Sequence, residues 1–203
     1  MGSDWIIFTN DGKLNTDQTL RLNTGGATNF ENLGGSSANE ILYGDNEDNI
    51  IAGGGLFSGP GSGAAPTGGG TDSVYGLNGN DTLYANGKLY GGAGNDKLIA
   101  FTNEDILDGG KGADTLTGGN GADTFVLRAG DGGSTKVNAD TITDFKDGTD
   151  VLGLDDGLKY TDLTITQSGN DTVITKGSEY LAILEGFDVA DLTEADFTPV
   201  DIA

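Results

Sequence analysis

The feature that most constrains the fold is a nine-residue repeat, GGxGxDxUx, in which U is a large apolar residue. It recurs from Thr67 to Val126 almost without a break, and three copies match at every defined position. A fixed period of this kind indicates that each repeat is one structural unit stacked on its neighbours. The copies are TGGGTDSVY (67–75), GLNGNDTLY (76–84), the shortened ANGKLY (85–90), GGAGNDKLI (91–99), AFTNEDILD (100–108), GGKGADTLT (109–117) and GGNGADTFV (118–126).

Two weaker copies precede this series. They are GGSSANEIL (34–42) and YGDNEDNII (43–51), and a glycine-rich stretch over 52–66 then breaks the register. We expect that stretch to be a flexible surface excursion.

Each position of the repeat has a physical role. Glycines at positions 1, 2 and 4 allow a tight turn that aims carbonyl oxygens at one point, and the Asp at position 6 adds a carboxylate. Positions 7 to 9 are extended, so the middle residue points inward. The predicted interior therefore consists of Ile41, Ile50, Val74, Leu83, Leu89, Leu98, Leu107, Leu116 and Phe125.

Two repeats form one flattened coil, so that turns two repeats apart stack at the strand spacing of about 4.8 Å. Two bare carboxylates at that distance repel by about 3.5 kcal/mol at an effective dielectric constant of about 20. Each repeat gains only about 1.5–3 kcal/mol from its single large apolar side chain. A cation between the turns must complete the fold, and six or more flexible oxygen ligands favour calcium over magnesium.

Charge and composition exclude several classes of protein. The formal net charge of -22 argues against nucleic acid and anionic membranes as partners and favours cations. The sequence has no Cys and no His, which excludes disulfides, thiolate or histidine zinc sites and histidine-dependent triads within it. No run approaches the roughly 18 apolar residues of a membrane span, and the N-terminus does not read as a signal peptide.

The nonapeptides resemble the calcium-binding repeats of the repeats-in-toxin (RTX, haemolysin-type) family. The resemblance implies an all-β fold, a right-handed parallel β-roll of nonapeptide repeats with an antiparallel β cap at its C-terminal end. It also implies several Ca²⁺ ions between turns two repeats apart, each held by backbone carbonyls and two position-6 aspartates. On one edge of the roll this pairs Asp81 with Asp96 and Asp96 with Asp114, and on the other it pairs Asp105 with Asp123.

The same resemblance yields further candidate ligands. Asp72 occupies position 6, but the short repeat has only Asn86 near the ligand position, which leaves a site joining Asp72 to Asp105 open. The early repeats offer Asn39 and Asp48. The candidate backbone ligands are Gly91, Ala93, Gly109, Lys111, Gly118 and Asn120.

An acidic run follows the last repeat. Residues 138–154 resemble the sequence that closes an RTX roll, which implies that Asp140 pairs with Asp114 at a final calcium. Asp144 and Asp150 are further candidate ligands in this run. The alternative is a solvated acidic turn.

The chain divides into three expected parts. Residues 1–33 are an N-terminal cap or the tail of a larger parent protein, and residues 34–126 are the roll with its insertion at 52–66. Residues 127–203 form a capping region in which runs from Leu163 onward, separated by SGND and KGSE, predict an antiparallel meander. RTX chains with such endings resemble cargo of type I secretion systems, which implies an extracellular or cell-surface location.

Three functions fit these observations. The first is a calcium-binding structural module of a secreted protein that folds on calcium after export. The second is the C-terminal module of an enzyme or toxin, although this sequence has no HExxH or GxSxG motif and we expect no catalysis within it. The third is a surface that recognises a glycan, ice or another cell through outward residues such as Tyr75, Tyr84 and Tyr90. Glycine-rich acidic disorder would explain the composition but not the regular spacing.

Overall fold

The computed structural model describes residues 4–7, 18–21, 30–34, 39–53 and 70–202. Within these ranges the regular structure is β, apart from three single-turn 3-10 helices, and no α-helix occurs. None of the described helices is long and apolar enough to cross a membrane. The predicted insertion lies outside the described residues except for its first two positions.

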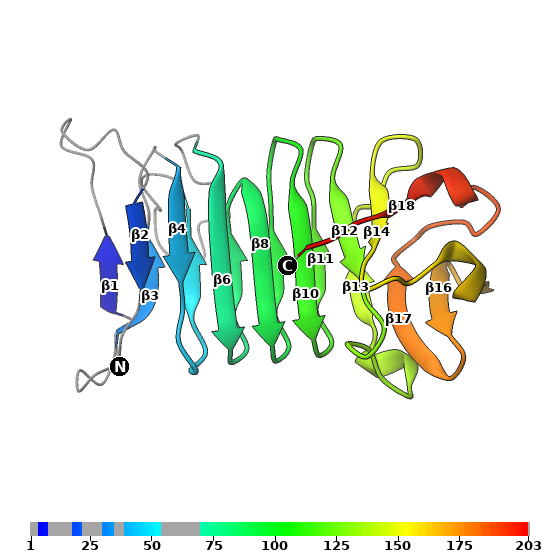
Figure 1. The fold of residues 1–203 in the computed structure, drawn as a ribbon, viewed down its shortest axis with the longest axis horizontal. Coiled ribbons are helices and arrows are strands. Elements are labelled where there is room, and N and C mark those ends of the chain that lie inside the picture. Colours follow the sequence, from blue (N-terminus) through cyan, green and yellow to red (C-terminus); the bar gives the residue numbers. More distant parts are fainter. Residues whose placement is uncertain (1–3, 8–17, 22–29, 35–38, 54–69, 203) are drawn as a thin grey trace.

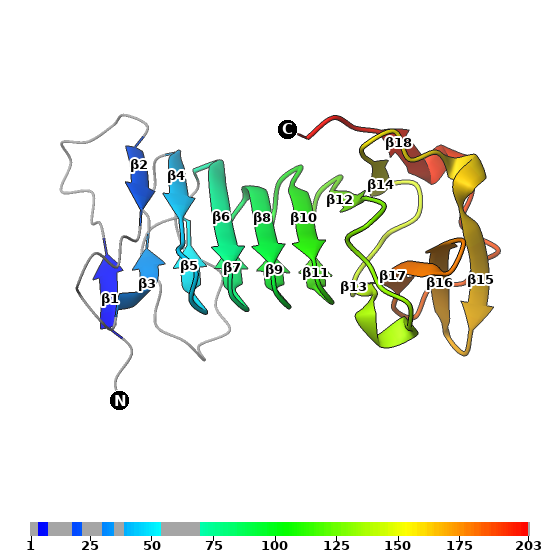
Figure 2. The ribbon, with the colours of Figure 1, turned by 60° about the horizontal axis from the view of Figure 1, so that its bottom comes forward.

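As the chain advances from β1 to β14, its strands alternate between two sheets, so two consecutive strands make one coil (Figures 1 and 2). The first sheet contains, in spatial order, β1 (Asp4–Ile7), β3 (Phe30–Gly34), β5 (Ile50–Ala52), β7 (Thr82–Tyr84), β9 (Lys97–Ile99), β11 (Thr115–Thr117), β13 (Asp140–Ile142), β17 (Glu179–Leu184), β16 (Asp171–Lys176) and β15 (Thr164–Ser168).

The second sheet contains the even-numbered strands of the coils and is closed by the last strand of the chain. Its spatial order is β18 (Phe197–Pro199), β14 (Val151–Leu154), β12 (Thr124–Leu127), β10 (Ile106–Lys111), β8 (Gly87–Ala93), β6 (Asp72–Asn78), β4 (Glu40–Tyr43) and β2 (Gln18–Arg21). Neighbouring strands of the coils pair in parallel in both sheets. The predicted parallel β-roll, with two repeats per coil, is therefore confirmed.

The roll has a thin interior made of two ladders of single side chains. Strand pairing places each apolar position-8 residue over the equivalent residue of the next coil, as in the register of Leu83, Leu98 and Leu116. The members of both ladders are fully buried: Leu42, Ile51, Val74, Leu83, Leu89, Leu98, Leu107, Leu116, Phe125, Ile142 and Leu152. Seven of the nine predicted interior residues are in this set.

The other two predicted interior residues are wrong by one position. Ile41 and Ile50 are only half-buried, whereas Leu42 pairs with Val74 and Ile51 pairs with Leu83. Because successive side chains of a strand point to opposite faces, a shift of one residue exchanges inside and outside. In the early copies, position 6 is therefore occupied by Glu40 and Asn49 and not by the predicted Asn39 and Asp48.

The C-terminal end of the roll is covered by the predicted antiparallel meander. β15, β16 and β17 pair antiparallel, and β17 also pairs in parallel with β13, so the meander extends the first sheet (Figure 2). β18 pairs with β14 and closes the second sheet. Between the sheets, Phe145 packs against Phe125 and Phe187, with ring centroids 6.2 Å and 5.3 Å away.

Single-turn 3-10 helices η1 (Lys136–Asn138), η2 (Tyr160–Asp162) and η3 (Glu194–Asp196) connect the strands of the cap. At the other end, three parallel pairings continue the two sheets: β1 pairs with β3, β3 with β5, and β2 with β4. The boundary at residue 33 stays a prediction.

Candidate metal centres

The glycine turns are held in a conformation that other residues cannot adopt. Gly94 and Gly112, at position 4, have φ angles of +141° and +143°. A Cβ atom on Gly94 would lie 1.6 Å from the carbonyl oxygen of Gly79, and one on Gly112 would lie 1.7 Å from that of Gly94. In these two turns, position 4 therefore requires glycine both for its backbone angle and for the close approach of the neighbouring coil.

The position-6 residues form two ladders, one along each edge of the roll. The Asp81 edge consists of Asn49, Asp81, Asp96, Asp114 and Asp140. On this edge the backbone N–H of each residue donates to the Oδ1 atom of the next, with N···O distances of 2.7 Å to Asp81, Asp96 and Asp114 and 3.0 Å to Asp140. The predicted pairs of this edge are thus adjacent in space.

The Asp105 edge consists of Glu40, Asp72, Gly87, Asp105, Asp123 and Asp150. Glu40 N–H donates to Asp72 at 2.9 Å, Asp105 N–H to Asp123 at 3.0 Å and Asp123 N–H to Asp150 at 3.1 Å. Gly87 interrupts this ladder because it has no side chain, and Asp72 N–H donates instead to the carbonyl of Asn86 at 2.7 Å. Asp72 and Asp105 are therefore separated by one coil whose position 6 is a glycine.

One oxygen of each central aspartate has no hydrogen-bond donor. The Oδ2 atoms of Asp81, Asp96, Asp105, Asp114 and Asp123 are buried and have no partner, although the Oδ1 atoms of the same groups are all bonded. These oxygens lie inside the glycine turns: a Cβ atom at Gly91 or Gly109 would lie only 2.4 Å or 2.3 Å from the Oδ2 of the aspartate in the same repeat. A buried carboxylate oxygen without a donor requires a proton or a cation.

The electrostatics agree with that requirement. Burial raises the pKa of Asp72, Asp81 and Asp114 to about 7 and that of Asp96 and Asp123 to about 6. Burial also raises the pKa of Asp105 and Asp140. In the absence of a cation, these carboxyl groups therefore bind protons much more readily than ordinary aspartates do.

Backbone carbonyls converge on the same turns. The Gly91 carbonyl oxygen lies 2.5 Å from the Cβ position of Gly76, and that of Gly109 lies 2.6 Å from the Cβ position of Gly91. The carbonyls of Ala93 and Lys111 accept hydrogen bonds from Gly79 at 3.0 Å and Gly94 at 2.9 Å, which leaves each a second lone pair. The described part of the chain has no group of three acidic side chains that could hold a metal ion, so carbonyls would have to supply most of the ligands of an ion in these turns. Such a donor set, two carboxylates and several carbonyls, fits calcium.

Other predicted ligands have different environments. Asp150 takes position 6 on the Asp105 edge, whereas Asp144 accepts N–H groups from Gly118 at 2.9 Å and Gly119 at 2.8 Å. Asn120 donates its N–H to the carbonyl of Phe101 at 2.9 Å.

Asn39 and Asp48 are exposed and lie one residue before position 6. They accept N–H groups of the next coil, from Thr71 at 2.8 Å and from Asn80 at 2.7 Å. Position 5 has its own ladder, which continues through Asn95 and which the nonapeptide pattern does not mark. The recurring Asn before the position-6 Asp was the available signal.

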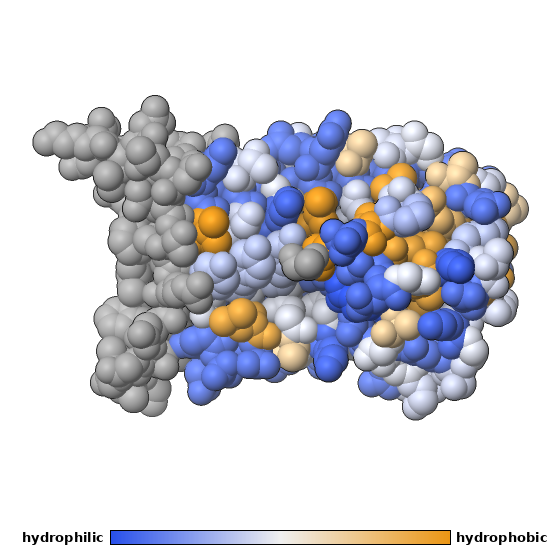
Figure 3. All heavy atoms as spheres, in the orientation of Figure 1, coloured by the Kyte–Doolittle hydropathy of each residue, from blue (hydrophilic) through white to orange (hydrophobic). Residues whose placement is uncertain are grey.

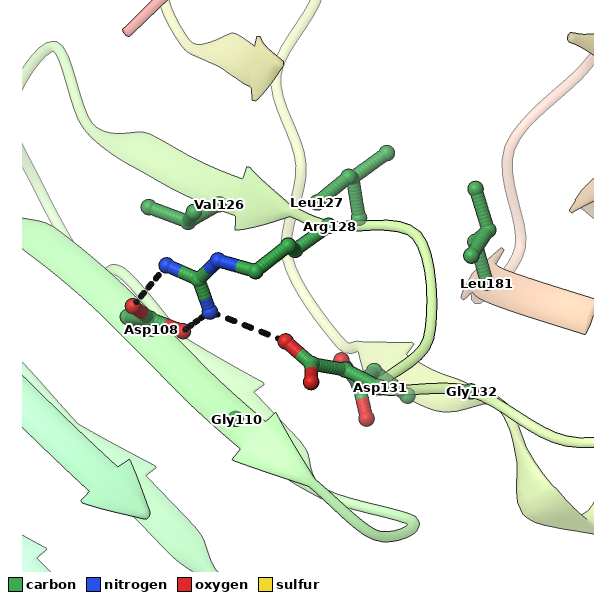
Figure 4. Close-up of a pocket in the computed structure, with 9 residues that line it drawn as sticks. Asp108, Gly110, Val126, Leu127, Arg128, Asp131, Gly132 and Leu181 are labelled. Atoms are coloured by element: carbon green, nitrogen blue, oxygen red, sulfur yellow. Dashed lines mark hydrogen bonds and ion pairs between the residues drawn. The ribbon is translucent and has the colours of Figure 1, made fainter. Parts of the chain in front are cut away.

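A second cluster of charge lies on the even-numbered sheet, where Arg128 contacts carboxylates from three coils. Figure 4 shows its contacts with Asp108 and Asp131. Its guanidinium nitrogens lie 2.9 Å from Asp108, 2.9 Å from Asp131 and 2.6 Å from Asp155. Burial raises the pKa of Asp155, but the hydrogen bonds from Arg128 and from backbone N–H groups, together with the charge of Arg128, outweigh this effect and lower the pKa overall. Here an arginine, rather than a metal ion, neutralises stacked aspartates.

The chain was compared with known proteins. The family model described as Peptidase M10 serralysin C terminal matches residues 7–165. No curated protein matches the chain.

Among solved structures, the extracellular lipase LipA of Serratia marcescens aligns with a TM-score of 0.46 and 16% identity, over 87% of this chain and 41% of the lipase. The R2 subunit of the mannuronan C5-epimerase AlgE6 of Azotobacter vinelandii aligns with a TM-score of 0.37 and 26% identity, over 81% of this chain and 89% of that subunit. The chain thus spans less than half the length of the lipase.

Proposed function

Since the chain belongs to the family of serralysin C-terminal regions of M10 peptidases, we propose that it is a calcium-binding structural module of a secreted protein that folds on calcium after export. The observation that carries this proposal is the set of buried Oδ2 atoms, on Asp81, Asp96, Asp105, Asp114 and Asp123, that have no hydrogen-bond donor. Calcium ions between the turns would satisfy these oxygens together with the carbonyls that face them.

Folding would then be coupled to binding. At neutral pH the metal-free roll must hold rows of desolvated carboxylates, and its interior contributes only one large apolar side chain per repeat. The free energy of calcium binding therefore becomes free energy of folding. A chain that stays unfolded where calcium is scarce suits export before folding.

The direct test is circular dichroism of the chelator-treated protein during a calcium titration. We expect a cooperative gain of β signal that the same concentrations of magnesium do not produce, because Mg²⁺ requires a stricter octahedron and retains its waters. Asp96→Asn should raise the calcium midpoint at least about tenfold, since even the loss of an outer-shell partner of a metal site has effects of that size. Glu185→Gln, an exposed change of equal charge in the cap, should not shift it. An unchanged spectrum on adding calcium would refute the proposal.

We propose that the chain itself is not catalytic. The matched family model describes a C-terminal region, and the sequence has no histidine or cysteine to serve as base or nucleophile. The coding sequence around the module tests whether an enzyme domain is attached to it.

We also propose that the C-terminal residues direct export through a type I system to the cell exterior. Residues 174–203, fused to an unrelated passenger and expressed with a type I exporter, should bring the passenger into the medium. Retention of the fusion inside the cell, with the exporter shown to be active, would contradict this assignment.

Glycan recognition is a second candidate function, and the aromatic stack on the even-numbered sheet favours it. Tyr43, Tyr75 and Tyr90 stack with successive ring centroids 4.7 Å apart, and the stack ends at Tyr90. That ring borders an open pocket of about 260 Å³, which is lined by Tyr90, Gly92, Asp108, Gly110, Lys111, Arg128 and Asp131. An aromatic face beside fixed carboxylates suits a neutral sugar ring.

Binding of the calcium-loaded protein to an array of neutral glycans tests this candidate. We expect Tyr90→Ala to abolish binding and Tyr84→Ala, on the opposite sheet, to preserve it. If the wild-type chain binds no glycan, glycan recognition is refuted and only the structural role remains.

A further inference from the structure

Asp45 shares the feature that marks the position-6 aspartates, although it lies at position 2 of its repeat. Its Oδ2 atom is buried and has no hydrogen-bond partner, as is true of Asp81 in the next coil. Among the buried carboxylate oxygens without a donor in the described residues, Asp45 supplies the one that the repeat pattern does not explain. The full-length repeats from Thr67 onward have glycine, leucine or phenylalanine at this position.

The turn that contains Asp45 also departs from the pattern at position 6, where Asn49 replaces aspartate. Asn49 is buried, and its amide contacts Asp45 twice: Asp45 N–H donates to Asn49 Oδ1 at 2.8 Å, and Asn49 Nδ2 donates to Asp45 Oδ1 at 3.2 Å. The two substitutions compensate each other. In this turn the carboxylate is at position 2 instead of position 6, and the amide side chain at position 6 hydrogen-bonds to it.

The rest of this turn matches its neighbours. Asn49 N–H donates to Asp81 Oδ1 at 2.7 Å, and all the following steps of the Asp81 edge have the equivalent bond, at 2.7 Å or 3.0 Å. The Gly76 carbonyl oxygen lies 2.6 Å from the Cβ position of Gly44, just as the Gly91 carbonyl lies 2.5 Å from that of Gly76. Two carboxylates and a convergent carbonyl are therefore present here, as between Asp81 and Asp96.

A second observation points to a ligand at this place. Asp81 is only 1% exposed, its Oδ2 has no donor, and its Oδ1 accepts the N–H of Asn49, the same residue whose amide contacts Asp45. Asn49 thus hydrogen-bonds both carboxylates, Asp81 through its backbone N–H and Asp45 through its Nδ2.

We propose that Asp45 and Asp81 bind an additional Ca²⁺ between the turns 44–49 and 76–81, with Asn49 positioning Asp45. This extends the calcium ladder of the Asp81 edge by one coil, through a residue that the nonapeptide pattern does not mark. The proposal rests on the proposed calcium-binding function. It also assigns the early ligand to Asp45 rather than to the exposed Asp48.

The test is the number of calcium ions retained per chain, measured by atomic emission after gel filtration and by calorimetric titration. Asp45→Asn should bind one ion fewer than the wild type. Asp48→Asn is the matched control, because it removes the same charge three residues away at an exposed position, and it should keep the full number. The double variant Asp45→Gly with Asn49→Asp restores the regular pattern and should regain the lost ion.

Three results would separate the possible failures. An unchanged ion count in Asp45→Asn, or a loss in Asp48→Asn instead, would overturn the site at Asp45 and leave the calcium module intact. If Asp45→Asn does not fold, failure of the double variant to recover the wild-type count would overturn it as well. A wild-type chain that binds no calcium would instead refute the proposed function itself.

Discussion

At the scale of single residues, the two oxygens of each position-6 aspartate have separate roles. The Oδ1 atom accepts an N–H from the preceding coil and fixes the stacking, as in the bond from Asp81 to Asp96. The Oδ2 atom stays desolvated within its own turn. An amide at position 6 can be accommodated in the ladder, as Asn49 is, but it supplies no charge. The aspartate is needed because the turn requires both an acceptor and a negative charge.

This division predicts an unusual pH dependence of the metal-free chain. The folded-state pKa values of Asp81 and Asp114 are about 7, against 3.8 for an ordinary aspartate. A raised carboxyl pKa stabilises the fold at low pH, and this contribution is lost as the pH rises through about 7. In calcium-free buffer, acidification from pH 8 to about 5, still above the pI of about 4.1, should therefore increase the β signal in circular dichroism.

With saturating calcium, the same change of pH should have little effect on the spectrum, because the cation already neutralises these groups. A calcium-free chain that loses structure on acidification would contradict the burial of these carboxyl groups.

The position-4 glycines yield a second prediction at this scale. Gly94→Ala combines a φ of +141° with a contact of 1.6 Å to the Gly79 carbonyl, and should reduce the free energy of unfolding by more than about 3 kcal/mol. Gly169→Ala has a φ of +70° but no atom within 4 Å of the new Cβ, and should lose only about 1 kcal/mol. Urea denaturation at saturating calcium measures both. Equal losses would show that the backbone angle, and not the crowding between coils, limits position 4.

At the scale of elements, the regular repeats were predictable and the irregular ones were not. From Asp72 onward, the apolar position-8 residues and the parallel stacking follow from the nonamer alone, because period and strand alternation fix which side chain points inward. The predicted repeat positions were wrong by one residue at 34–51, where a double glycine suggested that the repeat starts one residue too early. There the register is set by pairing of β4 with β6 and β5 with β7, which are long-range contacts that a local pattern does not contain.

The Arg128 cluster could not be predicted from the sequence pattern either, since the partners of Arg128 come from β10, the loop after β12 and the residues after β14. Arg128→Gln leaves Asp108 and Asp155 without their cation, and should reduce the free energy of unfolding by about 3 kcal/mol even at saturating calcium. Arg128→Lys should recover only part of this, because lysine lacks the planar fork that bonds several carboxylates at once.

Chemical denaturation checks these values against Lys136→Gln. Lys136 lies 3.5 Å from Asp171 in a more exposed pair, whose loss should change the stability by less than about 1 kcal/mol. Equal effects of the two substitutions would show that the Arg128 cluster is an ordinary surface ion pair.

At the scale of the whole molecule, the roll is an elongated stack whose interior contributes only one large apolar side chain per repeat to drive collapse (Figure 1). Over the coils, hydrophobic residues appear only in small separate spots among hydrophilic ones on the face in Figure 3. The net charge of -22 opposes compaction throughout the chain. Neither general screening of this charge nor hydrophobic collapse could take the place of the proposed ions inside the turns, because the unsatisfied oxygens are buried.

Small-angle scattering and circular dichroism, measured together, test this distinction. With calcium, the radius of gyration should be about 20 Å, slightly above the roughly 17 Å of a compact chain of this length, and with chelator it should approach about 48 Å. Adding 1 M NaCl to the chelated chain shortens the Debye length to about 3 Å and should reduce the radius by weakening repulsion. It should not restore the β signal, because screening acts in solvent and leaves the desolvated Oδ2 atoms of the turns without a partner. Recovery of the β signal in salt alone would mean that long-range repulsion, rather than the local demand of the glycine turns for a cation, keeps the chain unfolded.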